Sequence, residues 1–332
     1  MDILLSLGCG GLVAVMVQYS GQLQALLGPA AALLVLHVVG LVTAYVYGWV
    51  RPAGGDPDFD RRRAPLWFLS AGILGIAVVY INMEVFVQAG LLLALAGTLA
   101  GQTLGAYIVE LTPWSRGGQS PLVQRAMVIG LIVPGSVLIG VQSGAGAGLI
   151  AAAFVPGFIL VVQSMFNSYN SSRWGHSRML VLNYVSALLV LVPLNLVVGS
   201  LWVAGEAGAG GASVGGALGA GAGGTGALGA SGQGAGLLSQ LGSVPPQVIL
   251  GGGVLGVAVV GTITYLLKRS SPVKTFLGLY AGQLGLGVVL DAIQAQSVAA
   301  EKLIGVALVA VGLVAGELKV FRGRLKADRR TQ

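Results

Sequence analysis

The stretch Gly97–Glu110, G-T-L-A-G-Q-T-L-G-A-Y-I-V-E, occurs a second time at Gly278–Asp291 as G-L-Y-A-G-Q-L-G-L-G-V-V-L-D. Both copies contain the tripeptide A-G-Q and place a carboxylate eight residues after the glutamine. In each copy the glutamine, Gln102 or Gln283, is the only strongly polar side chain between apolar flanks. The recurrence predicts that the chain is a duplication with one such segment in each half.

Composition predicts an integral membrane protein. Of the 332 residues, 55% are hydrophobic and 9% are charged, and the mean hydropathy is +0.87. Soluble domains, by contrast, carry about 25% charged residues. The single cysteine, Cys9, and the two histidines, His37 and His176, have no spacing that would hold zinc. We therefore expect neither a metal site nor a cofactor.

Apolar runs of the length that a helix needs to cross about 30 Å of hydrocarbon occur ten times. The runs are 3–22, 29–50, 65–82, 90–109, 125–141, 148–167, 179–203, 248–267, 273–290 and 303–320. Backbone groups in lipid must be hydrogen-bonded internally, and none of the runs alternates with the period of two that a barrel strand would show. The sequence therefore predicts an all-α protein with ten transmembrane helices.

The basic residues indicate the orientation of these helices. If all ten runs cross the membrane, 17 of the 18 lysines and arginines lie on one side, and only Lys302 lies on the other. Cytoplasmic loops carry the excess of Lys and Arg, so both termini are expected in the cytoplasm of a multi-pass inner-membrane protein.

The duplication extends beyond the opening stretch. Residues 65–75 align with 246–256 at the same 181-residue offset, and the glutamines Gln18 and Gln22 resemble Gln163 and Asn167. Five helices per unit is an odd number, so the second unit would enter the membrane from the opposite side, as an inverted-topology repeat. We expect repeats at 1–143 and 144–320, a Gly/Ala-rich extracytoplasmic linker at 205–242 with 16 glycines in 38 residues, and a basic cytoplasmic tail at 321–332.

The motifs of the two halves resemble a known family. They are a first-helix Q-x3-[N/Q] followed by a G-P or G-H turn, a third-helix G-x2-G, and a fourth-helix A-G-Q. In this order they are similar to YdcZ-type inner-membrane exporters of the drug/metabolite transporter superfamily, here with two five-helix units fused. The resemblance implies an EamA-like bundle that exports a small solute. The related small multidrug transporters depend on a first-helix glutamate, whereas this chain has Gln18 and Gln22 there.

Two interpretations of Gln102 and Gln283 stay open. Glycines precede them at four-residue spacing, at Gly97, Gly101, Gly278 and Gly282. Such small residues let helices approach closely, so the amides could bond a neighbouring backbone and serve only helix packing. Alternatively, the two amides line a substrate cavity near the membrane midplane, because polar groups inside a membrane are commonly functional.

Further polar residues are candidates for the same site. Gln18, Gln22, Gln163 and Asn167 form polar stripes on the first helix of each half, where they would line the substrate path or contact other helices. His37 is interpreted as a packing residue, and it is also the first candidate for proton coupling because it titrates near neutral pH.

These features favour a secondary transporter that exports a small metabolite or xenobiotic by alternating access. The alternative is a non-transporting membrane subunit whose amides serve packing or partner assembly. We do not expect an enzyme, since the sequence offers no nucleophile–base pair or metal-ligand set. The expected partners are the small-molecule substrate and anionic lipids at the basic tail, with no nucleic acid.

Overall fold

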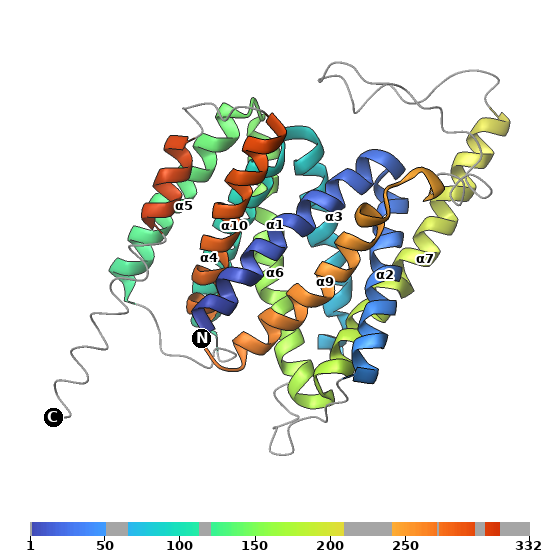
Figure 1. The fold of residues 1–332 in the computed structure, drawn as a ribbon, viewed down its shortest axis with the longest axis horizontal. Helices are drawn as coiled ribbons and strands as arrows, with labels where there is room; N and C mark the ends of the chain where they lie inside the picture. Colours follow the sequence, from blue (N-terminus) through green and yellow to red (C-terminus); the bar gives the residue numbers. More distant parts are fainter. Residues whose placement is uncertain are drawn as a thin grey trace.

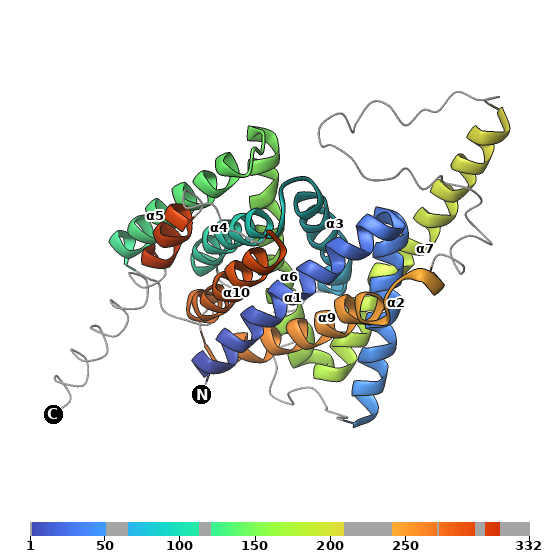
Figure 2. The same cartoon turned by 45° about the horizontal axis from the view of Figure 1, so that its top comes forward.

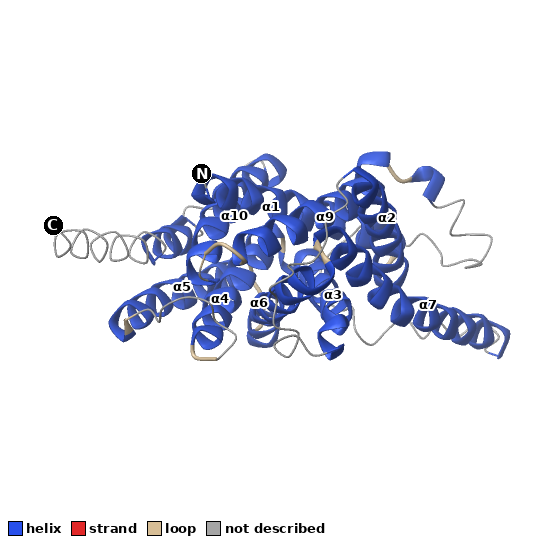
Figure 3. Cartoon of the chain, turned by 90° about the horizontal axis from the view of Figure 1, so that it is seen from below, coloured by secondary structure: helices blue, strands red, loops and turns tan. Residues whose placement is uncertain are grey.

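The computed structural model of the chain describes residues 2–50, 66–112, 121–208, 241–270, 272–295 and 303–312. Within these ranges the regular structure is helical, and nine helices are long and apolar enough to cross a membrane. Figure 3 shows these helices side by side with short connecting loops. The all-helical membrane class predicted from composition is therefore confirmed.

Long apolar segments form the helices, and most of the helices end at glycine, proline or a loop. The elements are α1 (Asp2–Leu27), α2 (Pro29–Val50), the 3₁₀ turn η2 (Leu66–Ser70), α3 (Ala71–Ala89), α4 (Leu91–Glu110), α5 (Leu122–Gln142), α6 (Ala147–Trp174), α7 (His176–Gly208), α9 (Pro246–Leu267) and α10 (Pro272–Ala295). Gly28, Gly90 and Gly175 separate consecutive helices with positive φ angles of 77° to 90°, which an L side chain rarely adopts.

Several helices are longer than the sequence predicts. Helix α6 continues to Trp174 and α7 continues to Gly208, so the first residues assigned to the Gly/Ala-rich linker are helical. Residues 209–240 of that linker lie outside the described part of the chain, as does the tail 321–332. Of the tenth predicted span, the structure describes the helix Leu303–Gly312.

Helix α4 lies at the centre of the bundle. Of the residues in its most apolar 18-residue segment, 89% are buried, compared with 28% in α7. Helix α4 contacts α1, α3, α5, α6 and α10, and α2 and α7 lie together at one end (Figures 1 and 2). At the other end, α5 packs against the helix Leu303–Gly312, where Gly135 and Gly305 face each other. The exposed leucines and valines of the outer helices are suited to contact with lipid.

Two helix crossings, α4 with α6 and α1 with α10, bring backbones into direct contact. Four glycines lie so close to a carbonyl of the partner helix that a Cβ atom would collide with it: Gly101 with Phe154, Gly157 with Thr98, Gly282 with Leu7, and Gly10 with Leu279. Gly97 likewise lies against Ala153. Gly97, Gly101 and Gly282 thus lie where two helix backbones approach closely, because small residues remove the side chain that would separate them. A packing role for Gly278 stays a prediction.

The two crossings repeat one another with constant shifts in numbering. Residues 98 and 101 of α4 correspond to 279 and 282 of α10, which is a shift of 181, and residues 7 and 10 of α1 correspond to 154 and 157 of α6, a shift of 147. A third pair of contacts obeys the same shifts. Gly72 lies against the carbonyl of Asn183, and Gly253, 181 residues later, lies against the carbonyl of Leu36, which is 147 residues before Asn183. Each of these contacts made by α1 and α10 therefore has a counterpart made by α6 and α4 at the shifted residue numbers.

The crossings give a direct test of this packing. We expect Gly282→Ala to lower the free energy of unfolding by about 1–3 kcal/mol, because the new methyl group must push α1 away from α10. The matched control is Gly285→Ala on the same helix, where a Cβ atom meets nothing within 4 Å. Thermal unfolding of the detergent-purified protein should show a lower midpoint for Gly282→Ala alone. Equal midpoints for the two variants would contradict the crossing.

Candidate functional site

Gln102 and Gln283 lie at the two crossings and are fully buried. Each side chain has an exposed fraction of 0%. The backbone nitrogen of Gln102 lies beside Gly157 of α6, and that of Gln283 lies beside Gly10 of α1. The glycine contacts that hold the bundle together therefore fix the position of both amides.

Neither amide has a hydrogen-bond partner within the described residues. The Oε1 and Nε2 atoms of both Gln102 and Gln283 are buried and unpaired. A buried polar group without a partner costs about 1–3 kcal/mol, and a side chain that served only helix packing would bond a neighbouring backbone instead. Unpaired groups of this kind are expected where a ligand supplies the missing hydrogen bonds.

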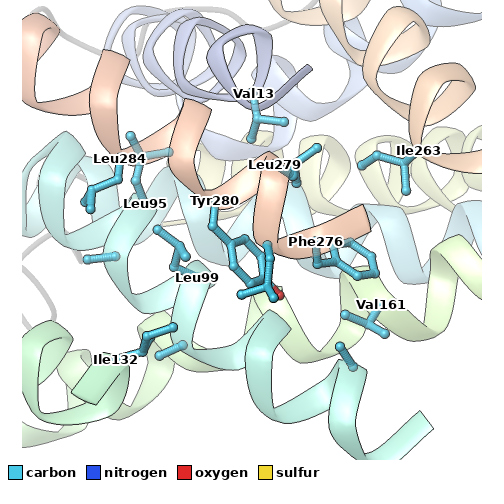
Figure 4. Packing of buried hydrophobic residues seen from close by; sticks show 14 of the residues in the cluster. Val13, Leu95, Leu99, Ile132, Val161, Ile263, Phe276, Leu279, Tyr280 and Leu284 are labelled. Atoms are coloured by element: carbon cyan, nitrogen blue, oxygen red, sulfur yellow. The ribbon is translucent and has the colours of Figure 1, made fainter. Parts of the chain in front are cut away.

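Helices α4 and α10 lie against each other and run in opposite directions. Leu95 of α4 packs on Gly287 of α10, and eight residues later Thr103 lies beside Tyr280. Gln102 and Gln283 lie along their helices between these two contacts. Figure 4 shows Leu95, Leu99 and Tyr280 in the layer between α4 and α10. The two amides thus belong to one region of the helix pair, and they do not bond each other.

The four polar residues of the first helices are not placed alike. Gln163 and Asn167 are buried with exposed fractions of 4% and 2%, whereas Gln18 and Gln22 are partly exposed. The Nε2 atom of Gln163 donates to Oδ1 of Asn183 at 3.4 Å. Asn167 Oδ1 and Gln18 Oε1 are buried without a partner in the described part of the chain. A role in substrate binding remains a prediction for these residues.

The contacts correct the alignment of these residues between the halves. Gln18 and Gln163 are 145 residues apart, but the helix contacts recur with a shift of 147. Gln163 meets Gly75, and the side chain that lies in the equivalent place near Gly256 is Met16. A difference of two residues is about 200° around a helix, so Gln18 and Gln163 lie on different faces.

His37 makes a hydrogen-bond contact and a ring contact that are typical of a packing residue. Its Nδ1 atom lies 2.8 Å from the carbonyl oxygen of Leu33 one turn earlier, and its ring meets the edge of Tyr184 at 6.0 Å between centroids. His37 and Tyr184 are themselves 147 residues apart, which is the shift that relates the helix contacts above. Proton coupling by His37 stays a prediction.

Polar pairs that the sequence did not reveal tie neighbouring helices together. Thr98 of α4 donates to Oδ1 of Asn82 of α3 at 2.6 Å. Gln24 of α1 donates to the carboxylate of Glu84 of α3 at 2.7 Å. Each of these bonds depends on how the helices pack, so the residues could be recognised as polar positions inside predicted spans but not as partners.

The carboxylates that end the two copies of the opening motif differ in their surroundings. Glu110 is 3.6 Å from the guanidinium of Arg125. Asp291 has an exposed fraction of 8%, and its Oδ2 atom is unpaired within the described residues. The described residues contain no group of three or more His, Cys, Asp or Glu side chains that could hold a metal ion.

The model of one protein family matches 1–138 and 225–315, which is more than half of the chain. Its description is "Putative inner membrane exporter, YdcZ". The chain belongs to the YdcZ family. This membership and the membrane-length helices make it a multi-pass inner-membrane protein. The residues between the matched segments include α6 and α7. The YdcZ match therefore covers both helices of the α1–α10 crossing, but only α4 of the α4–α6 crossing.

The other comparisons define the fold and not the substrate. No curated protein matches this YdcZ-family chain. A solved structure titled "Crystal structure of protein" is similar to it over 96% of this chain and 97% of its own, with a TM-score of 0.57 and 13% sequence identity. At this identity the similarity shows a shared fold alone.

The unpaired amides predict an unusual response to mutation. We expect Gln102→Leu and Gln283→Leu each to raise the free energy of unfolding by about 1–3 kcal/mol, because a leucine of similar size removes a buried group that lacks partners. The matched control is Thr98→Val, which leaves Asn82 Oδ1 without its donor and should lower the stability by about 1 kcal/mol. Thermal unfolding in detergent measures all three. If the leucine variants are destabilised as much as Thr98→Val, the amides serve helix packing.

Proposed function

We propose that this YdcZ-family protein is a secondary transporter that exports a small metabolite or xenobiotic by alternating access. The observation that carries the proposal is the pair of fully buried amides without partners, Gln102 and Gln283, at equivalent helix crossings. Their burial without hydrogen bonds is costly, and a structural role does not account for it. The family itself is one of inner-membrane exporters.

The transporter is built, in this proposal, from two inverted five-helix units at 1–143 and 144–320 with both termini in the cytoplasm. The exchanged contacts support it: α1 packs against α9 and α10, while α6 packs against α3 and α4. The opposite directions of α4 and α10 at their contact also fit an inverted repeat, since these helices carry the two copies of the opening motif.

The substrate binds near the midplane between Gln102 and Gln283. It supplies the donors and acceptors that these amides lack in the closed arrangement. Both amides are inaccessible to solvent here, and we interpret this arrangement as an occluded state of the proposed cycle. Loss of the substrate leaves the amides unpaired again, which favours opening of the site to water.

The glycine crossings determine which helices move together. Backbones in contact cannot slide far without collisions, so α4 moves with α6 and α1 moves with α10. Each of these pairs combines helices from both sequence halves. Gln102 lies on one pair and Gln283 on the other, and rocking of the pairs about the α4–α10 contact would open the site to one side and then to the other.

The proposal also keeps the membrane lipids as expected partners. The basic tail, which lies outside the described residues, is proposed to contact anionic lipid headgroups.

Cysteine accessibility tests alternating access. The native Cys9 is buried and is replaced by serine to give a cysteine-free background. We expect a membrane-impermeant maleimide to label Gln102→Cys slowly both in whole cells and in inside-out vesicles, because transport opens the site to each side in turn. The control is Ala94→Cys on the same helix, which is equally buried and should stay unlabelled. Labelling of Gln102→Cys from neither side would favour a non-transporting subunit.

A further inference from the structure

We infer that the site at Gln102 and Gln283 takes an uncharged, planar solute that carries a hydrogen-bond donor and an acceptor side by side, of which a carboxamide is the simplest example. The inference rests on the proposed function in placing the substrate at these two residues. It goes further by assigning the chemical class that the site selects.

Charge is the first reason. On the four helices of the two crossings, the described charged side chains lie at least eight residues along the helix from the crossing glycine and from Gln102 or Gln283. They are Asp2 on α1, Glu110 on α4, Arg173 on α6, and Lys274 and Asp291 on α10. Eight residues correspond to about 12 Å of helix. A cation or anion bound between the amides would therefore be buried without a counter-charge, and burial of an unpaired ion is far more costly than burial of a neutral group.

The second reason is the set of unpaired atoms. Both the Nε2 and the Oε1 atoms of each amide are free, so the site offers donors and acceptors in equal number. An apolar solute would leave all of them unpaired, and an ion would satisfy only donors or only acceptors. A carboxamide group satisfies one donor and one acceptor of a glutamine at once, in the two-bond arrangement by which amide side chains also bind the adenine edge.

The third reason is the aromatic surface beside the amides. Tyr280 lies one turn before Gln283, has an exposed fraction of 1%, and packs near Leu99 of α4 (Figure 4). Its hydroxyl lies beside Thr103 and is otherwise unpaired within the described residues, while the Thr103 hydroxyl donates to the carbonyl of Leu99 at 2.9 Å. Phe276 stacks on Tyr280 with an interplanar angle of 22°. Flat aromatic groups in this layer favour a planar solute and add one further polar contact.

Three probes of the same size separate charge from shape: benzamide, benzamidine and benzoate. We expect benzamide to raise the melting temperature of the purified full-length protein in a concentration-dependent way, and benzamidine and benzoate to bind at least about tenfold more weakly, which is 1.4 kcal/mol. Gln102→Leu and Gln283→Leu should each lose the benzamide shift. The control Gly285→Ala, at an open position of α10, should keep it.

A charge introduced at the site should reverse the preference. In Gln102→Glu we expect benzamidine to bind more tightly than benzamide, because the carboxylate supplies the missing counter-charge. If benzamidine or benzoate binds the wild type as well as benzamide does, if benzamide fails to bind, or if its shift survives in both leucine variants, the assignment of a neutral amide-like solute is wrong.

Exchange of radiolabelled benzamide in proteoliposomes distinguishes this inference from the proposed function. Binding with the expected preference but without exchange supports the solute class and contradicts transport. Exchange of benzamidine or benzoate in place of benzamide supports transport and overturns the solute class.

Discussion

The contact between helix backbones at glycine is the constraint on which the rest of the structure depends. Lipid tails are as apolar as leucine side chains, so the hydrophobic effect gives these helices little reason to associate inside a membrane. Close approach of the backbones instead holds the helices together by dense van der Waals packing. At Gly101 and Gly282 this approach leaves no room even for a methyl group, which fixes both the axial position and the rotation of α4 and α10.

The same constraint creates the candidate site. The residue after each of these glycines is a glutamine, so the contact that fixes the helix also buries an amide at the centre of the bundle. The two crossings involve helices that are close in space but come from different halves of the sequence. In the proposed mechanism each crossing moves as one unit, and each unit carries one glutamine. This arrangement suits a site that lies between moving parts, because motion of the units changes the surroundings of both amides together.

Polar residues within the membrane differ in whether their hydrogen bonds are made. Thr98 and Asn82 satisfy one another, and His37 lies within hydrogen-bond distance of the backbone of its own helix. Such pairs stabilise the folded state and need no ligand. Gln102 and Gln283 are buried at least as deeply, yet none of their side-chain polar atoms is paired. We expect these two positions to cost the folded state stability, as is common where a site must remain free to bind.

The sequence by itself determined the membrane class, the helical segments and the recurrence of the A-G-Q motif, because these depend on composition and on the length of apolar runs. It also pointed to Gly97, Gly101, Gly278 and Gly282 as candidates for close packing. It did not determine the partners of those glycines. It also aligned Gln18 with Gln163, although the structure places these two residues on different helix faces. Only the tertiary structure decided that α4 packs on α6 and α1 on α10, and that the central amides are unpaired while Thr98 and Asn82 are bonded. The physical reason is that a hydrogen bond or a backbone contact between helices depends on their relative rotation and position, and neither is encoded in the hydrophobicity of a single helix.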